Sequence, residues 1–215
     1  MSTRSCVGVV KNGEFKVAQY CQFDGYPTGV GEGVMNFLKN IDIQKFSEKI
    51  NNLPSWLSDK RKEEINKEIN DKNKTLNRAK YDYLLCDSDV LNYIYNDGWF
   101  IETRYNEKTG EPYEFKKGGF EIEGLLNDEK FFGDSLFCEW AYVIDLDKNV
   151  FEIYKGFNKR KLTEKDRFYY LQNNEPVAFD NEYKPVKIVG CYSLDKLPET
   201  LDEKTLKKSL KENIG

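Results

Sequence analysis

The sequence predicts an α+β fold: a mainly antiparallel sheet built from hairpins, with the helices of residues 30–97 covering one face. Three observations predict it. An Asn-Gly pair separates two β-rich segments near the start, charged segments with helical spacing follow, and alternating apolar residues return after residue 99. Aromatic residues make up 14% of the 215 residues, which is enough for a core. We expect a single domain over residues 1–215, with a charged helical insertion at about 55–80.

The first expected element is a hairpin. Ser5–Val10 and Glu14–Phe23 are β-rich, and the Asn12-Gly13 pair between them suits a type I′ turn, whose central residues both need positive φ. The register then pairs Val10 with Phe15, Gly8 with Val17 and Cys6 with Gln19. Cys6 and Cys21 are therefore expected on one face of the hairpin, an arrangement that a one-residue slip would destroy.

Four segments before residue 97 are expected to be helical. They are Val30–Asn40, Ile43–Leu53, Ser58–Lys80 and Asp87–Asn96. Pro54 ends the second, because proline cannot continue a helix. The third has only a thin apolar stripe, so most of it should face solvent. Ser88 is the expected N-cap of the fourth, and Gly98 is placed to terminate it.

The second half is expected to be rich in strands. The expected strands are Trp99–Tyr105, Tyr113–Phe115, Phe120–Leu126, Glu139–Leu146, Val150–Tyr154 and Val186–Tyr192, and a surface helix is expected over Leu201–Ile214. Glu139–Leu146 and Val150–Tyr154 form the clearest hairpin. Val186–Tyr192 is apolar enough to be a central strand. The adjacent Tyr169 and Tyr170 cannot both point inward on a strand, so one of them is available to a partner.

A turn with four glycines and one proline, from Gly25 to Gly33, joins the first hairpin to the first helix. Glycine serves where the backbone needs positive φ or where another group comes close. A strand that ends in such a turn and opens a helix can present free N–H groups to a ligand. We therefore place a candidate ligand-binding site here. Its members are Arg4, Cys21, Asp24, Gly25, Tyr26, Gly29 and Gly31.

This turn does not match a known phosphate-binding motif. It lacks the G-x-x-x-x-G-K-[ST] loop and the G-x-G-x-x-G fingerprint. Glu32, in the first helical turn, would also repel a phosphate. The alternative interpretation is a structural crossover, in which the glycines serve close backbone packing.

The composition excludes several classes of chemistry. The chain has no histidine, which removes Ser-His-Asp and Cys-His catalysis and the H-E-x-x-H zinc site. Asp145, Asp147 and Asn149 begin a calcium-loop pattern, but Val150 and Gly156 stand where it needs glycine and glutamate. An ordinary hairpin turn is therefore expected there, and we predict no metal and no cofactor.

Charge and hydropathy limit the partners and the location. The net charge is −4, with both signs interspersed, which disfavours binding to duplex nucleic acid. There is no apolar run near 18 residues and no signal-peptide pattern, so no membrane partner is expected. The five cysteines are scattered, as is typical of reduced thiols in a cytoplasm. Oligomeric state is not predicted.

One catalytic alternative survives the absence of histidine. Hydrolases with an N-terminal nucleophile use their own α-amine as the base. Cys6 opens a strand that leads into a hairpin, as such nucleophiles do, but it would need removal of five residues. An intact mass that starts at Met1 or Ser2 would eliminate this amidohydrolase hypothesis. The structural alternative is that Cys6 serves only as a small, buried apolar side chain.

Two blocks of the sequence resemble a group of phage and prophage proteins. The first is Ser2–Ser5 through Val9 with the segment Tyr20–Gly31, similar to T-R-S-x-I-G-I followed by Y-C-x-[FW]-D-G-Y-P-x-G-x-G. The second is Glu139–Asp147 with Phe151–Phe157. The chain has Gln22 where many of that group have histidine.

The resemblance implies an accessory protein of a mobile element, made in an infected bacterial cytoplasm. Accessory proteins of this kind often antagonise host defence. We therefore expect a non-enzymatic role: binding a host bacterial protein or a small nucleotide-like signalling ligand, and so blunting antiviral defence. A plain interaction scaffold is a third hypothesis. It predicts that Cys21 and Asp24 tolerate alanine, whereas the charged Ser58–Lys80 helix does not.

Overall fold

A computed structural model describes residues 2–71, 80–85, 89–172, 182–202, 204–206 and 209. It has a five-stranded sheet in the order β2-β1-β5-β6-β7 and a separate two-stranded sheet, β3-β4. The strands are β1 (Ser5–Lys11), β2 (Glu14–Cys21), β3 (Trp99–Tyr105), β4 (Pro112–Gly118), β5 (Trp140–Asp145), β6 (Val150–Lys155) and β7 (Lys187–Ser193). The α+β class is confirmed.

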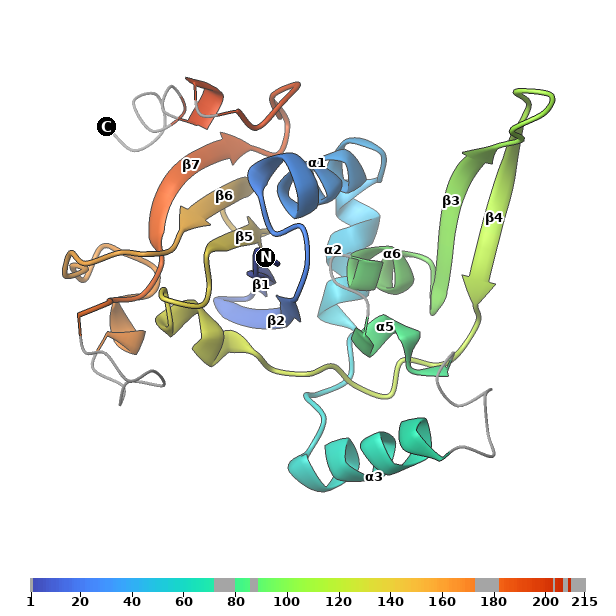
Figure 1. The fold of residues 1–215 in the computed structure, drawn as a ribbon, viewed down its shortest axis with the longest axis horizontal. Coiled ribbons are helices and arrows are strands. Elements are labelled where there is room, and N and C mark those ends of the chain that lie inside the picture. Colours follow the sequence, from blue (N-terminus) through green and yellow to red (C-terminus); the bar gives the residue numbers. More distant parts are fainter. Residues whose placement is uncertain are drawn as a thin grey trace.

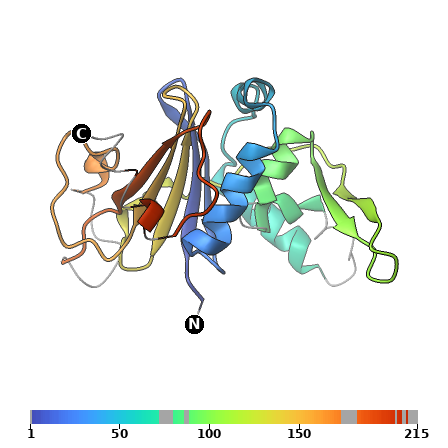
Figure 2. The same ribbon diagram turned by 90° about the horizontal axis from the view of Figure 1, so that it is seen from above.

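Most of the helices before residue 97 lie between the two sheets, whereas the charged helix of residues 59–70 lies at the bottom of the view in Figure 1 (Figures 1 and 2). The described helices are the π-helix η1 (Pro27–Gly31), α1 (Glu32–Lys39), α2 (Ile43–Asn51), α3 (Asp59–Asn70), α5 (Asp82–Leu85) and α6 (Asp89–Tyr95). Their apolar side chains share one core with one face of the five-stranded sheet, as Val34 and Phe46 do with Val9 and Ile144. The prediction that the helices of residues 30–97 cover one face is therefore confirmed.

The second face of the five-stranded sheet has its own core. It contains Cys6 and Tyr154 from the sheet, together with Phe132 and Phe168. Phe132 comes from the 3-10 helix η2 (Glu129–Gly133), and Phe168 precedes the 3-10 helix η3 (Tyr169–Leu171). Both faces are thus buried, which explains why central β5 is apolar on both sides. Among the described residues, no helix combines the length and the apolar character needed to cross a membrane.

The pairing of the strands differs from the sequence prediction in three ways. β1 pairs with β5 in parallel, so the main sheet is mixed. β7 lies at the edge of the sheet beside β6, not at its centre. The β3-β4 hairpin forms as predicted but belongs to its own sheet. Phe120–Leu126 is not a strand: Leu125 O accepts the Leu57 N–H at 2.9 Å, and the segment continues as a loop.

The first hairpin has the predicted turn but a shifted register. Val10 pairs with Phe15 as predicted. A bulge between Val9 and Val10 then shifts by one residue every pair that lies farther from the turn. Cys6 therefore pairs with Tyr20, not Gln19, and Gly8 with Ala18, not Val17. Because successive strand residues point to opposite faces, Cys6 enters the second core and Cys21 the helix-side core. The prediction that the two cysteines share a face is wrong.

Helix ends follow local signals. Ser58 caps α3 by accepting the Arg61 N–H at 3.2 Å. α3 ends at Asn70, shorter than the predicted Ser58–Lys80, and residues 72–79 lie outside the described part. Ser88 also lies outside it, as does most of the predicted helix over Leu201–Ile214. Gly98 terminates α6 as predicted: its φ is +83° and its N–H donates to Tyr93 O at 2.8 Å.

Candidate functional site

The glycine turn is closed by hydrogen bonds within the chain. Gly25 N–H donates to Thr3 O at 2.9 Å, and Val30 N–H donates to Asp24 O at 2.9 Å. Gly29 and Gly31 both donate to Tyr26 O, at 3.0 and 3.2 Å. These four N–H groups therefore have partners already, and an anion docking here would have to displace them.

The glycines of this turn permit close packing. A Cβ at Gly25 would lie 2.8 Å from Thr3 O, and one at Gly31 would lie 2.7 Å from Cε1 of Tyr142. A Cβ at Gly29 would collide with the Asp24 carbonyl. The Tyr142 hydroxyl, fully buried on β5, donates to Gly25 O at 2.8 Å. This is the packing that a structural crossover requires, and it fills the space that a nucleotide cradle would leave open.

Glu32 and Asp24 also serve the local structure. Glu32 Oε1 accepts the Leu201 N–H at 3.1 Å, which anchors the C-terminal segment to the first turn of α1. Asp24 adopts φ +50°, a left-handed conformation that aspartate tolerates better than most residues. Both acidic groups thus help to shape the joint between β2 and α1.

The two candidate cysteines are buried. Cys21 has no exposed surface, and its thiol donates to Gln19 O at 3.6 Å. Cys6 is also fully buried, and burial raises the pKa of its thiol well above the usual value. A cysteine nucleophile needs the opposite, an accessible sulfur with a lowered pKa.

Arg4 is the predicted site residue with the richest surroundings. Its guanidinium lies 4.6 Å from the ring centroid of Phe137, and Nη2 lies 3.9 Å from Glu139 Oε1. Its Nε is buried without a hydrogen-bond acceptor among the described residues. Thr3, the preceding residue, pairs with Gly25, so Arg4 lies beside the glycine turn. The structure thus brings Arg4 and the turn together.

Exposed aromatic rings flank this joint. Phe23 is 60% exposed, Tyr26 47% and Phe137 37%, although large apolar side chains are usually buried. Phe23 and Tyr26 lie within two residues of Gly25, and Phe137 lies against Arg4. We call Arg4, Phe23, Tyr26 and Phe137 the N-terminal aromatic surface. Sequence analysis included Arg4 and Tyr26 but missed the two phenylalanines, because their exposure depends on tertiary contacts.

A second feature, not predicted from the sequence, is a pocket of about 540 Å³ at the tip of the first hairpin. It is lined by Val10, Gly13, Glu14, Phe15, Trp56, Glu129, Arg167 and Tyr170. Tyr170, one of the two adjacent tyrosines, is 50% exposed here. The pocket draws on four separate stretches of the chain, so no local motif could have indicated it.

Arg167 links this pocket to a buried ionic cluster. Its Nε donates to Glu152 Oε2 at 2.7 Å, and its Nη2 pairs with Asp145. The Tyr154 hydroxyl donates to the same Glu152 oxygen at 2.7 Å. Asp145 also accepts the N–H groups of Asp147 and Lys148, at 3.1 and 2.9 Å, as a hairpin turn requires. The acidic residues of the calcium-like pattern therefore form a turn and an ion pair.

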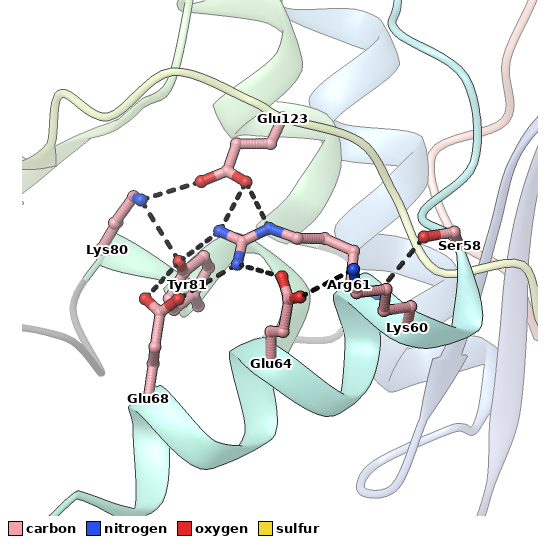
Figure 3. A network of polar contacts seen from close by, with 8 residues as sticks. All are labelled: Ser58, Lys60, Arg61, Glu64, Glu68, Lys80, Tyr81 and Glu123. Carbon is pink, nitrogen blue, oxygen red and sulfur yellow. Dashed lines mark hydrogen bonds and ion pairs between the residues drawn. The ribbon is translucent and has the colours of Figure 1, made fainter.

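A second arginine organises the surface of α3 (Figure 3). Arg61 donates through Nε and Nη2 to Glu123 Oε2, at 2.9 and 2.7 Å, and through Nη1 to Glu68 at 3.0 Å. Lys80 pairs with the other Glu123 oxygen at 2.8 Å, and Tyr81 donates to Glu68 at 2.7 Å. This network ties α3 to the loop after β4.

Comparison of the chain with models of protein families, with curated proteins and with solved structures found no match.

Proposed function

We propose that this chain is a binding protein of a phage or prophage, which attaches to a host bacterial protein in the cytoplasm and blunts antiviral defence. The observation that carries the proposal is the N-terminal aromatic surface, where Arg4 lies against exposed Phe137 and the neighbouring glycine turn carries exposed Phe23 and Tyr26. Tyrosine, phenylalanine and arginine are enriched in protein interfaces, and arginine and tyrosine dominate their binding energy. The phage resemblance covers three of its four members, Arg4, Phe23 and Tyr26.

A protein partner fits this surface better than a small nucleotide-like ligand. Four N–H groups of the glycine turn already have acceptors, and side-chain or backbone atoms fill the space beside Gly25, Gly29 and Gly31. Exposed aromatic rings and an arginine, on a joint that backbone hydrogen bonds hold rigid, suit a large partner. The rigidity of the joint also lowers the entropic cost of binding.

The amidohydrolase alternative receives less support. It requires an accessible Cys6, whereas this side chain is enclosed between two paired strands and under η2. Its raised thiol pKa also disfavours the thiolate. A binding role needs no nucleophile, and we prefer it for that reason.

Site-specific photo-crosslinking tests the binding proposal. A benzophenone-bearing phenylalanine analogue would replace Tyr26, and in a matched control Tyr113, which is 48% exposed on β4. In living bacterial cells we expect one discrete protein adduct from position 26 and none from position 113. The adduct should disappear when Phe23→Ala and Arg4→Ala are added. Identical adducts at both positions, or none at position 26, would contradict the proposal.

A plating assay tests the role in defence. We expect expression of the chain to restore plaque formation by a phage on a host that carries the affected defence system. Phe23→Ala with Tyr26→Ala should reduce that rescue at least tenfold, whereas Tyr105→Ala with Tyr113→Ala should preserve it. Equal rescue by both double variants would separate the N-terminal aromatic surface from any anti-defence role.

A further inference from the structure

The pocket at the hairpin tip is chemically distinct from the N-terminal aromatic surface. β1 runs between them, so about 20 Å of strand separates the two. Three aromatic residues, Phe15, Trp56 and Tyr170, line the pocket together with the carboxylates Glu14 and Glu129. Phe15 is held by stacking on Phe132 and Phe168, with centroids 5.3 and 6.0 Å away. The aromatic wall therefore has a fixed support.

The electrostatic balance of the pocket is negative. Arg167 is the cation among the residues that line it, and both its Nε and its Nη2 already face carboxylates. Asp145 and Glu152 carry two negative charges, with side chains only 2% and 10% exposed, and Arg167 is their buried cation. Lys148 also faces Asp145, at 3.9 Å, but its side chain is 68% exposed, where such a pair contributes little. An incoming anion would meet a neutralised arginine and two further carboxylates, Glu14 and Glu129.

The neighbours of Glu14 and Glu129 do not cancel the negative charge that these two carboxylates bring to the pocket. Glu129 accepts a hydrogen bond from the Tyr170 hydroxyl, which carries no charge. Glu14 pairs with Lys16 at 3.0 Å, but the Glu14 side chain is 74% exposed, where such a pair contributes little. Glu129 thus supplies a net negative charge beside aromatic rings, the combination that recognises ammonium groups.

We propose that this pocket binds an organic cation through an ammonium group, which would lie among Trp56, Tyr170 and Glu129. The volume of about 540 Å³ lies in the range of small-molecule sites. Ring faces attract the cation through their quadrupoles, and Glu129 adds a direct ion pair. The ammonium group comes from a small-molecule amine or quaternary ammonium compound, or from a lysine side chain, and each presents a cationic nitrogen to the pocket.

Calorimetric titration of the full chain tests the proposal. The probes are spermidine, choline and a lysine-containing peptide, with inorganic phosphate as the opposite charge, at about 0.15 M salt to suppress long-range attraction. We expect saturable one-to-one binding of at least one ammonium probe, and none of phosphate. Preference for spermidine assigns a small-molecule amine, preference for choline assigns a quaternary ammonium compound, and preference for the peptide assigns a lysine side chain.

Matched variants separate this site from general attraction to an acidic protein. Glu129→Gln and Glu102→Gln change the net charge equally, but Glu102 lies on β3, away from the pocket. We expect Glu129→Gln to weaken ammonium binding at least tenfold and Glu102→Gln less than twofold. Trp56→Leu provides a second test should Glu129→Gln fail to fold. Saturation by no ammonium probe at about 10 mM, equal weakening by both glutamine variants, or tighter binding of phosphate would overturn the proposal.

Discussion

Arg61 and Arg167 have partners of the same kinds, carboxylates and a tyrosine hydroxyl, but they differ in how deeply they are buried. Each guanidinium binds two or more carboxylates and belongs to a network with a tyrosine hydroxyl. The Arg61 side chain is 28% exposed, and its partner carboxylates are 28–45% exposed. The Arg167 side chain is 14% exposed, and its partners only 2% and 10%. The two networks therefore contain the same kinds of ion pair and hydrogen bond, but the side chains around Arg167 are much more deeply buried than those around Arg61.

This difference in burial predicts which network contributes more to the stability of the fold. Exposed ion pairs are screened by water and contribute little, even when geometry is good. In a buried cluster the charges depend on each other, because the loss of one leaves the rest without solvent or partner. Arg61 therefore fastens a surface helix, whereas Arg167 compensates the carboxylates beneath the hairpin-tip pocket.

The largest effect is expected from Arg167→Met. It leaves Asp145 and Glu152 buried without Arg167, with only the exposed Lys148 ammonium facing Asp145 at 3.9 Å, which should lower the free energy of unfolding by about 3–5 kcal/mol. Urea unfolding followed by fluorescence measures it. Adding Asp145→Asn and Glu152→Gln should recover part of the loss, since no uncompensated charge remains. A loss below about 1 kcal/mol for Arg167→Met would mean that water reaches the cluster.

A matched pair of tyrosine variants sharpens the comparison. Tyr154→Phe removes a 2.7 Å hydrogen bond to buried Glu152. Tyr81→Phe removes one of the same length to half-exposed Glu68, together with the oxygen that accepts from Arg61 and Lys80 at 2.9 and 3.2 Å on the same partly exposed surface. We expect losses of about 2 and about 1 kcal/mol, because hydrogen bonds to charged groups are stronger and costlier to lose in the interior. Thermal unfolding of both variants in parallel provides the measurement. An equal or reversed order would contradict the assigned difference in burial.

Arg61→Met should have a smaller effect than Arg167→Met. We expect about 1 kcal/mol, since its partners regain water once the guanidinium is gone. Added salt should shrink this loss but leave that of Arg167→Met nearly unchanged, because buried pairs are screened much less. Unfolding at low and high salt tests this, and the same salt response for both variants would break the comparison.

The smallest expected effect is on the pH dependence of stability. Hydrogen bonds from Tyr81 and Arg61 hold the pKa of Glu68 below its usual value, and Lys80 and Arg61 do so for Glu123. A lowered folded-state pKa stabilises the fold above the unfolded value of about 4.3, and this is lost as pH falls through the folded pKa. The difference between wild type and Arg61→Met should therefore shrink as the pH falls below about 4.3 and through the lowered folded-state pKa values. A difference in the free energy of unfolding that grows as the pH falls would contradict the lowered pKa values of Glu68 and Glu123.

Local features were predictable. Asn12 and Gly13 adopt φ +58° and +76°, as an Asn-Gly turn requires, and Gly98 ends α6 in the left-handed region. The hairpins of residues 99–118 and 140–155 also follow from alternation of apolar residues. The sequence pattern placed Arg4 and Tyr26 in a candidate site, and the structure places both at the β2–α1 joint. Whether a partner binds there stays a prediction.

Other features depended on contacts that no local pattern encodes. The bulge at Val9 and Val10 separated Cys6 from Cys21, and the edge position of β7 contradicted its apolar sequence. Arg167 and Asp145 are 22 residues apart in the chain, and neither has a neighbour in sequence that indicates the other. The pocket above them therefore could not be predicted.

By itself, the sequence determined the α+β class, the turns, most helix and strand positions and the absence of histidine chemistry. Those properties depend on dihedral preferences and side-chain periodicity over a few residues. The tertiary structure alone decided the parallel pairing of β1 with β5, the faces of the cysteines, the closed glycine turn and the two arginine networks. These depend on which distant segments pack together, and a shift of one residue in strand register is enough to change them.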